Sequence, residues 1–276
     1  MKNILLVADA GGEVGWGHVM RTLAVAEALE GRASVRWLTS TPEAIRGLDP
    51  PCPVGTKSEG VGQLAWTEPS AWVLTDGKPT EELAEERACA WEVVDFGTGE
   101  GRLSRICPHF GAESRDWGSG MVATGPRWMP LRRDFVRDAQ IDCDWLDLNY
   151  EPYAKDGKLL TYRADAVNAL AGMPDKDVVS LFDVNAKDRK WWTEGPYRYA
   201  IVPPSTIAYE CMALGIPVLL VPVEGQSREI GDAMVAAGVA YWYSDGGGDL
   251  EPIAKRARKH VDGWGAERVA NLLLGG

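Results

Sequence analysis

The feature that most constrains the fold is a regular alternation of short apolar runs and amphipathic helical patterns along the whole chain. In the first half, apolar runs of strand length occupy residues 4–8, 34–38, 71–74, 91–94 and 121–124, and helical patterns occupy 19–29, 42–47 and 80–89. In the second half, the strand-like runs are 158–161, 178–182, 199–202, 217–221 and 239–243, and the helical patterns are 164–171, 206–214, 229–237 and 252–274. Strands that alternate with helices predict parallel sheets covered on both faces. We therefore expect an α/β protein.

An acidic, irregular stretch at residues 138–157 interrupts this alternation near the middle of the chain. A length of 276 residues is enough for two domains of ordinary size. We therefore predict two Rossmann-like domains, residues 1–152 and 153–276, whose sheets face a central cleft. Ligands of open α/β sheets bind beyond the carboxyl ends of the strands, so the residues that directly follow strands are the candidates for a site.

The overall charge limits the partners. A net charge of −11 and a pI of about 4.9 oppose generic attraction to nucleic acid or to anionic membranes. Two local basic clusters are expected to be solvated helix faces. The first cluster is Arg127, Arg132, Arg133 and Arg137, and the second is Lys255, Arg256, Arg258, Lys259 and His260. Nucleic acid is then possible only as an acceptor substrate.

Other parts of the composition exclude several classes of protein. No apolar stretch approaches the roughly 18 residues of a membrane span. The five cysteines are scattered without a C-x-x-C pair, and the three histidines are far apart. This usage predicts a cytoplasmic protein with neither a disulfide framework nor a metal site.

The first candidate site follows the strand at residues 4–8. Gly15, Trp16, Gly17 and His18 form a glycine-rich loop that leads into a helical run. A helix N-terminus attracts negative charge, glycine lets the backbone approach a ligand, and histidine exchanges protons near neutral pH. The loop has neither G-x-G-x-x-G spacing nor a P-loop Lys, and an ordinary strand–helix turn stays an equal alternative.

The second candidate site follows the strand at residues 199–202. Ser205 or Thr206 is a good N-cap for the next helix, whose first amides form another anion site. Glu210 lies about one turn further on and can face the same side. A carboxylate there can accept hydrogen bonds from both hydroxyls of a ribose. The alternative is a capped helix with a solvated glutamate.

These motifs resemble a known family. Residues 15–24 (GWGHVMRTLA) look like the Gly-x-Gly-His-x-x-Arg start of the UDP-sugar hydrolases of the pseudaminic-acid pathway. Spore-coat polysaccharide proteins and the N-acetylglucosaminyltransferase of peptidoglycan synthesis are similar. Residues 125–135 resemble a Gly-Pro…Leu-Arg…Phe segment of the hydrolases, and residues 205–217 resemble the donor-site motif of all three groups. Gln226 matches a glutamine that contacts the donor sugar in this family.

The resemblance implies a GT-B arrangement that binds a nucleotide-sugar without a metal or other cofactor. Glu210 would hold the ribose of UDP, Ser205 and Thr206 would lie near the phosphates, and His18 would be the base. The chain departs from the hydrolases after the strand at 158–161, where their glycine-rich loop is replaced by Tyr-Arg-Ala-Asp. Arg163 could replace the lost backbone amides as a phosphate contact.

The predicted reaction is displacement at the anomeric carbon of a UDP-sugar with inversion. If an acceptor hydroxyl attacks, the protein is a glycosyltransferase, which the altered donor loop favours. Trp16 is then a platform for the acceptor or, equally, a packing residue. If water attacks, the protein is a hydrolase. Two further alternatives are a transferase that glycosylates hydroxymethylated bases in phage DNA and a non-catalytic nucleotide-sugar binder. The sequence does not identify the acceptor.

Overall fold

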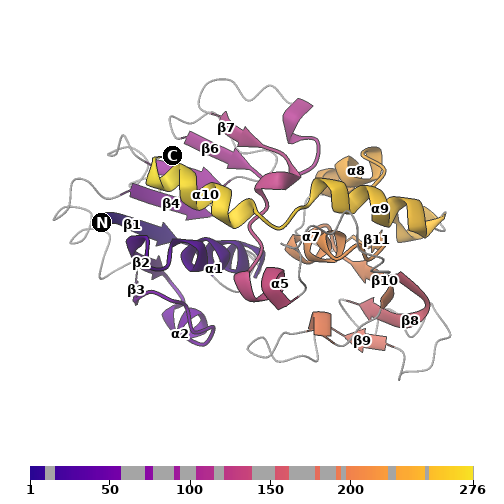
Figure 1. The fold of residues 1–276 in the computed structure, drawn as a ribbon, viewed down its shortest axis with the longest axis horizontal. Helices are drawn as coiled ribbons and strands as arrows, with labels where there is room; N and C mark the ends of the chain where they lie inside the picture. Colours follow the sequence, from indigo (N-terminus) through magenta and orange to yellow (C-terminus); the bar gives the residue numbers. More distant parts are fainter. Residues whose placement is uncertain are drawn as a thin grey trace. The chain divides into compact units, whose positions relative to one another are not determined.

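The computed structural model describes residues 1–9, 16–56, 72–76, 90–93, 104–114, 121–138, 153–161, 178–180, 191–193, 197–222, 228–245 and 249–275. The chain divides into two compact units (Figure 1). The first unit contains residues 1–133 and 264–276, and the second contains residues 134–263.

The first unit is built on a parallel sheet of seven strands in the order β3-β2-β1-β4-β5-β6-β7. The strands are β1 (Lys2–Val7), β2 (Ala33–Thr39), β3 (Val54–Thr56), β4 (Trp72–Asp76), β5 (Ala90–Val93), β6 (Ser104–Cys107) and β7 (Met121–Thr124). The strand order proceeds outward in opposite directions from β1 and β4. These two neighbours therefore form the switch point, where ligands bind in doubly wound sheets.

The core of the first unit joins the two ends of the chain. Helix α1 (Gly17–Leu29) packs against α10 (Gly265–Leu274), which is drawn in yellow beside the indigo and magenta strands in Figure 1. Leu6 of β1, Leu23 of α1 and Leu273 of α10 are all fully buried in one cluster. Apolar residues on α1 and α10 therefore cover one face of the sheet, whose strands carry consecutive buried residues.

The second unit contains a parallel sheet of five strands in the order β12-β11-β10-β8-β9. The strands are β8 (Tyr153–Thr161), β9 (Val178–Ser180), β10 (Tyr197–Val202), β11 (Val218–Leu220) and β12 (Tyr241–Trp242). The helices are α5 (Arg133–Asp138), α7 (Thr206–Ala213), α8 (Arg228–Ala236) and α9 (Leu250–His260). Here the order reverses between β8 and β10, which are the switch point of this sheet.

The predicted alternation of strands and helices is confirmed over most of the described residues, and helix α5 is additional. All ten predicted strands overlap observed ones, although β3 and β6 are additional. Strand β3 has three residues and β6 carries a buried arginine, Arg105, so neither gives a clear apolar signal. The remaining helix α2 (Pro42–Arg46) matches its prediction. The helices predicted at 80–89 and 164–171 lie outside the described residues.

The single helix predicted at residues 252–274 is wrong, because two helices occupy this stretch. Helix α9 ends at His260, and α10 begins at Gly265. Between them Val261 is extended, and Gly263 adopts a left-handed φ of 82° that a continuing helix cannot accommodate. The break also separates the units, since α9 belongs to the second and α10 to the first. The predicted domains, 1–152 and 153–276, place both helices in one domain.

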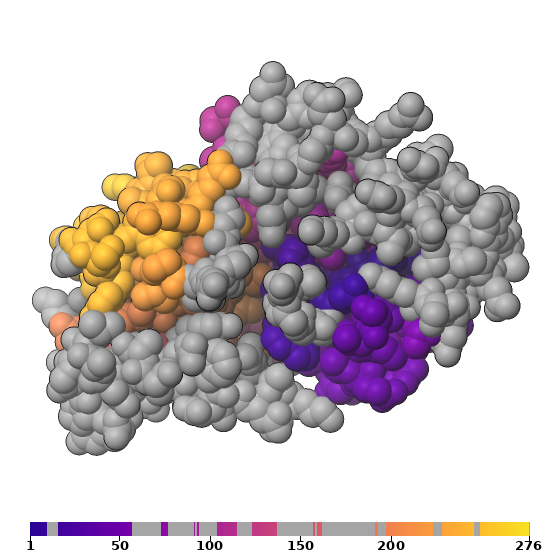
Figure 2. All heavy atoms as spheres, turned by 180° about the vertical axis from the view of Figure 1, so that it is seen from behind, coloured from indigo at the N-terminus to yellow at the C-terminus, as the bar shows by residue number. Residues whose placement is uncertain are grey.

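Charged side chains cover parts of the surface of each unit. In Figure 2 the region coloured violet, which contains α2 and β3, lies at the surface of the first unit.

The basic side chains of the first cluster are partly paired with acids. Arg133 pairs with Glu30, and Arg132 lies near Glu27. The second cluster lies on α9, where Lys255 pairs with Glu251. Among the described residues, no helix is both long and apolar enough to cross a membrane.

Candidate functional site

The candidate base lies at the start of the first helix. Trp16 is the N-cap of α1, Gly17 is its first residue and His18 its second, while Gly15 lies outside the described residues. No side chain caps this helix start, and no acidic residue lies in the first turn. The side chain of His18 keeps 18% of its surface exposed, so the imidazole is open to a ligand on one side.

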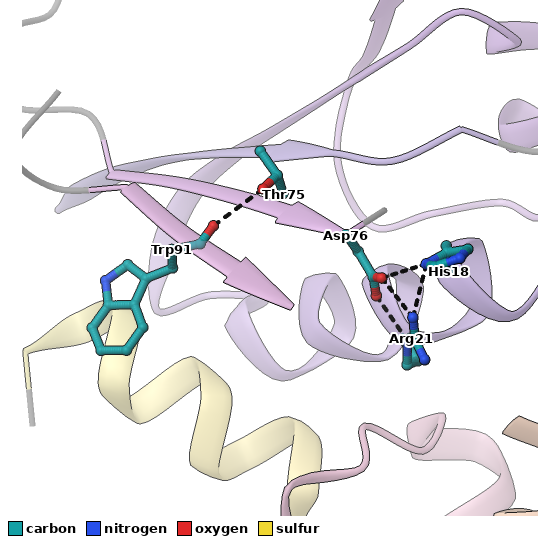
Figure 3. A network of polar contacts seen from close by, with 5 residues as sticks. All are labelled: His18, Arg21, Thr75, Asp76 and Trp91. Carbon is teal, nitrogen blue, oxygen red and sulfur yellow. Dashed lines mark hydrogen bonds and ion pairs between the residues drawn. The ribbon is translucent and has the colours of Figure 1, made fainter. Parts of the chain in front are cut away.

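A buried carboxylate holds the His18 ring. Asp76 is the last residue of β4, and its Oδ1 lies 2.6 Å from His18 Nδ1 (Figure 3). Arg21, one turn after His18 on α1, donates from Nε to Asp76 Oδ2 at 2.9 Å and from Nη2 to Oδ1 at 2.7 Å. The Asp76 side chain is only 1% exposed. This contact engages Nδ1 of the imidazole, and Nε2 is the ring nitrogen that remains for a substrate.

The environment of Asp76 favours its ionised form. Burial acts to raise the pKa of this carboxyl, but the Arg21 guanidinium, the His18 ring and the hydrogen bonds from both hold it below its ordinary value. Asp76 is therefore a carboxylate near neutral pH, and a carboxylate can only accept hydrogen bonds. A proton on His18 Nδ1 is donated to it, which leaves the lone pair of Nε2 free to take a proton.

This pair lies at the switch point of its sheet. His18 follows β1 and Asp76 ends β4, and these are the adjacent strands between which the strand order reverses. The Trp37 indole donates from Nε1 to the Ala8 carbonyl at 3.1 Å and anchors the exit of β1. The Asp9 carboxylate accepts hydrogen bonds from the Thr39 hydroxyl and the Ser40 amide. The end of β1, at Ala8 and Asp9, is thus fixed to the neighbouring strand β2.

The predicted donor residues follow the corresponding point of the second sheet. Ser205 is the N-cap of α7, directly after β10, but its hydroxyl does not cap the helix. Thr206 is a buried residue, with 7% of its surface exposed, and its Oγ1 has no hydrogen-bond partner among the described residues. A buried hydroxyl without a partner is costly in a folded protein. No side chain caps the start of α7 either. An uncapped helix start beside a buried hydroxyl is typical of a site where a polar ligand supplies the missing hydrogen-bond partners.

The remaining donor residues are only partly described. Glu210 lies on α7, one turn after Thr206, and is buried, so it is not the solvated glutamate of the alternative interpretation. Arg163 and Gln226 lie outside the described residues. The roles of Gly15, Gly17, Ser205, Thr206, Glu210, Arg163 and Gln226 in binding a donor stay predictions.

Trp16 is one of the large apolar side chains that the described structure leaves exposed, at 39%. Its carbonyl accepts the Met20 amide at 3.0 Å, so helical geometry already begins at Trp16. Side chains two residues apart on a helix do not face each other, and Trp16 and His18 therefore point to different sides of α1. Only a ligand that lies over the end of the helix could contact both.

Sequence reasoning missed Asp76 and assigned no role to Arg21. The predicted strand ended at residue 74, whereas β4 continues through Asp76. The available signal was an aspartate at the end of an apolar run, on a strand that a parallel sheet brings beside the first. Arg21 was visible three residues after His18, a spacing that puts both side chains on one face of a helix. Among the described residues, no group of three or more metal-binding side chains is present.

Comparison with known proteins bears on the fold. No family model matches the chain, and no curated protein matches its sequence. The chain is similar in structure to the glycosyltransferase SnogD from Streptomyces nogalater, with a TM-score of 0.60 at 16% identity over 100% of both chains. It is similar to MnaA with UDP from S. aureus, with a TM-score of 0.59 at 12% identity over 98% of this chain and 95% of that one. It also resembles the glycosyltransferase SsfS6 with thymidine diphosphate from Streptomyces sp. SF2575, with a TM-score of 0.55 at 13% identity over 100% of both.

These similarities and the two parallel sheets define the class of fold. The chain has the GT-B fold of glycosyltransferases, which consists of two Rossmann-like units. The GT-B prediction is thereby confirmed. The narrower resemblance to the pseudaminic-acid-pathway hydrolases and spore-coat proteins stays a prediction, as does a cleft between the two domains.

Proposed function

We propose that this protein is an inverting glycosyltransferase that moves a sugar from a nucleoside-diphosphate sugar to an acceptor hydroxyl, with His18 as general base. The observation that carries the proposal is the contact of 2.6 Å between His18 Nδ1 and Asp76 at the switch point of a GT-B fold. An imidazole held through Nδ1 by a buried carboxylate presents Nε2 as a base, as in other histidine–aspartate pairs.

The reaction follows from this arrangement. His18 Nε2 takes the proton of the acceptor hydroxyl as its oxygen attacks the anomeric carbon. The bond between the anomeric carbon and the phosphate oxygen breaks, and its electron pair leaves with the nucleoside diphosphate. Asp76 stabilises the imidazolium that forms. Attack opposite the leaving group inverts the configuration of the anomeric carbon.

The second unit supplies the proposed donor site. The first amides of α7 and the Thr206 hydroxyl suit the diphosphate, because a helix N-terminus favours negative charge. Glu210 is the proposed ribose ligand, and Arg163 and Gln226 would contact the phosphate and the sugar. Solved structures with this fold contain UDP or thymidine diphosphate, which supports a pyrimidine nucleoside diphosphate as the leaving group. Charge stabilisation by amides and side chains needs no metal in this proposal.

The test separates transferase, hydrolase and binder. The purified protein is incubated with UDP-sugars and TDP-sugars, with and without a panel of sugar and phenolic alcohols, and release of nucleoside diphosphate is measured. We expect release that depends on an alcohol. Release with water alone would favour the hydrolase, and nucleotide binding without release under every condition would contradict both enzymatic functions.

Replacement of the base tests the role of His18. We expect His18→Ala to reduce kcat by roughly two to four orders of magnitude, the usual contribution of a general base. The control is His260→Ala, an exposed histidine at the end of α9. An unchanged rate in His18→Ala with intact nucleotide binding would rule out His18 as the base.

A further inference from the structure

Arg21 contacts both members of the His18–Asp76 pair (Figure 3). Its Nε and Nη2 donate to the two different oxygens of Asp76, and the same Nη2 lies 2.8 Å from His18 Nδ1. All of this occurs in a buried setting, since the Arg21 and Asp76 side chains are almost completely enclosed. A planar guanidinium that binds both oxygens of a carboxylate fixes its orientation as well as its charge.

Arg21 and Asp76 compete for one atom, Nδ1 of His18. Arg21 can only donate and ionised Asp76 can only accept, whereas Nδ1 of a neutral imidazole does one or the other. If Nδ1 accepts from Arg21, the proton is on Nε2 and the exposed side of the ring is a donor. If Nδ1 donates to Asp76, Nε2 is a base. The orientation of the Asp76 carboxylate therefore determines which tautomer His18 adopts.

We propose that Arg21 is a positioning residue that selects the basic tautomer of His18 by holding Asp76 Oδ1 against Nδ1. The shorter of the two contacts to Nδ1 is the one to Asp76, 2.6 Å against 2.8 Å. The Nε and Nη2 atoms of Arg21 each bind one oxygen of the carboxylate, which fixes its orientation. Arg21 thus acts through Asp76 rather than on the substrate. The inference rests on the proposed function for its catalytic meaning, but not for its structural content.

The inference predicts a spectroscopic signature that needs no substrate. The chain has three histidines, so the ring nitrogens of a protein labelled with ¹⁵N-histidine can be assigned by loss of signals in His18→Gln. The spectra are recorded at increasing pH until the His18 signals no longer change. We expect wild-type His18 to show a protonated Nδ1 and an unprotonated Nε2, each near its limiting chemical shift.

Two substitutions separate orientation from charge. In Arg21→Lys the positive charge remains, but a single ammonium group cannot bind both oxygens in a fork. In Arg21→Met both are lost. We expect the His18 nitrogens of Arg21→Lys to move toward the averaged shifts of a ring that exchanges between tautomers. If Arg21→Met does not fold, Arg21→Lys carries the test alone.

The matched control is Arg32→Lys. Arg32 lies just beyond the other end of α1, where it pairs with Glu267, and it contacts neither His18 nor Asp76 in the bonds it makes to Ala28, Glu267 and Asn271. It should leave the His18 signals unchanged. Wild-type shifts for His18 in folded Arg21→Lys would overturn the inference, whatever the enzymatic activity of the protein.

Kinetics give a second measurement once a substrate pair is known. Because Arg21 acts on the geometry of the base and not on the donor site, Arg21→Lys should lower kcat by about 100-fold and leave the KM for the nucleotide-sugar unchanged. A rise in KM with unchanged kcat would show a role in substrate binding instead and would overturn the positioning role. Failure of the transferase assay itself would contradict the proposed function, while the tautomer measurement would still decide the role of Arg21.

Discussion

At the scale of residues, the pair His18–Asp76 shows how a parallel sheet creates a site from distant parts of the chain. The two residues are 58 positions apart in sequence, yet the pairing of β1 with β4 brings their side chains to 2.6 Å. Neither residue is unusual alone. The buried position of Asp76 and its bonds to Arg21 make the contact specific, because a carboxylate that is removed from water needs fixed partners.

Substitution of Asp76 by Asn tests this contact. The amide of Asn can donate to Nδ1 as readily as it accepts, so the ring loses its preferred tautomer while the size of the side chain hardly changes. We expect kcat to fall by roughly two to four orders of magnitude, as for loss of the base itself. Thr75→Val is the control, since the Thr75 hydroxyl donates to the Trp91 carbonyl and does not contact His18 (Figure 3). Equal rates in the two variants would contradict the role of Asp76.

The contribution of Asp76 to the free energy of unfolding should depend on pH, and Asp76→Asn measures it. The pKa of Asp76 in the folded protein is below the 3.8 of an ordinary aspartate, so the unfolded chain binds its proton first as pH falls. The stability from the ionised form is fully present above that ordinary value and is lost as pH falls through the lower folded value. Near neutral pH, Asp76→Asn should lower the free energy of unfolding by about 3–5 kcal/mol, because it breaks a buried ion pair.

Urea unfolding of wild type and Asp76→Asn, at neutral pH and in steps below about pH 4, measures this difference. The difference should be constant around neutrality and shrink only in the acid range. A difference that stays constant below about pH 4, or that grows as pH falls from neutrality to pH 5, would show that the folded pKa of Asp76 is not depressed.

At the scale of elements, the sequence predicted much more of the strand and helix pattern than of the contacts within the site. Apolar periodicity was sufficient for β1, α1, β10 and α7, because burial of one face determines where such elements occur. It could not find β3, which has three residues, and it ended β4 two residues early. Asp76 was lost for that reason. His18 and Thr206 could be predicted as candidates because strand–loop–helix turns are visible locally, whereas a partner on another strand depends on the strand order.

The start of α7 gives a prediction that separates binding from stability. The Thr206 hydroxyl is buried and has no partner among the described residues, so Thr206→Val removes an unsatisfied polar group and keeps the shape. Stability should be unchanged or slightly higher. If the hydroxyl binds a phosphate of the donor, affinity for UDP should fall by about 1 kcal/mol, or roughly fivefold.

Calorimetric titration with UDP and thermal unfolding measure the two effects. Thr22→Val is the matched control, because the Thr22 hydroxyl on α1 is also buried without a partner among the described residues. It should have the same effect on stability and none on UDP affinity. Equal UDP affinities for wild type and Thr206→Val would rule out the phosphate role.

At the scale of the whole molecule, the C-terminal helix packs in the same unit as the N-terminal strand and helix. After α9 completes the second unit, α10 packs on α1 in the core of the first, and Lys2 donates to the Leu274 carbonyl. The domain boundary from sequence put all C-terminal residues in one domain, since local patterns do not reveal which unit a helix joins. Stability of the unit that carries His18 therefore depends on residues at the opposite end of the sequence.

Gly265→Ala tests this dependence at a single atom. A Cβ at Gly265 would lie 2.0 Å from the Met129 carbonyl oxygen and 2.4 Å from its carbon. Backbone atoms cannot rotate away, so α10 must shift from its place, and we expect the first unit to lose about 1–3 kcal/mol of stability. Gly55→Ala in β3 of the same unit is the control, because the nearest atom there is the end of the Leu38 side chain at 3.3 Å. Urea unfolding compares the two variants. Helix α10 covers α1 rather than the His18 ring, so the activity of folded Gly265→Ala should stay close to that of wild type. Equal stability of Gly265→Ala and Gly55→Ala would contradict the close packing of α10 on the segment that precedes α5.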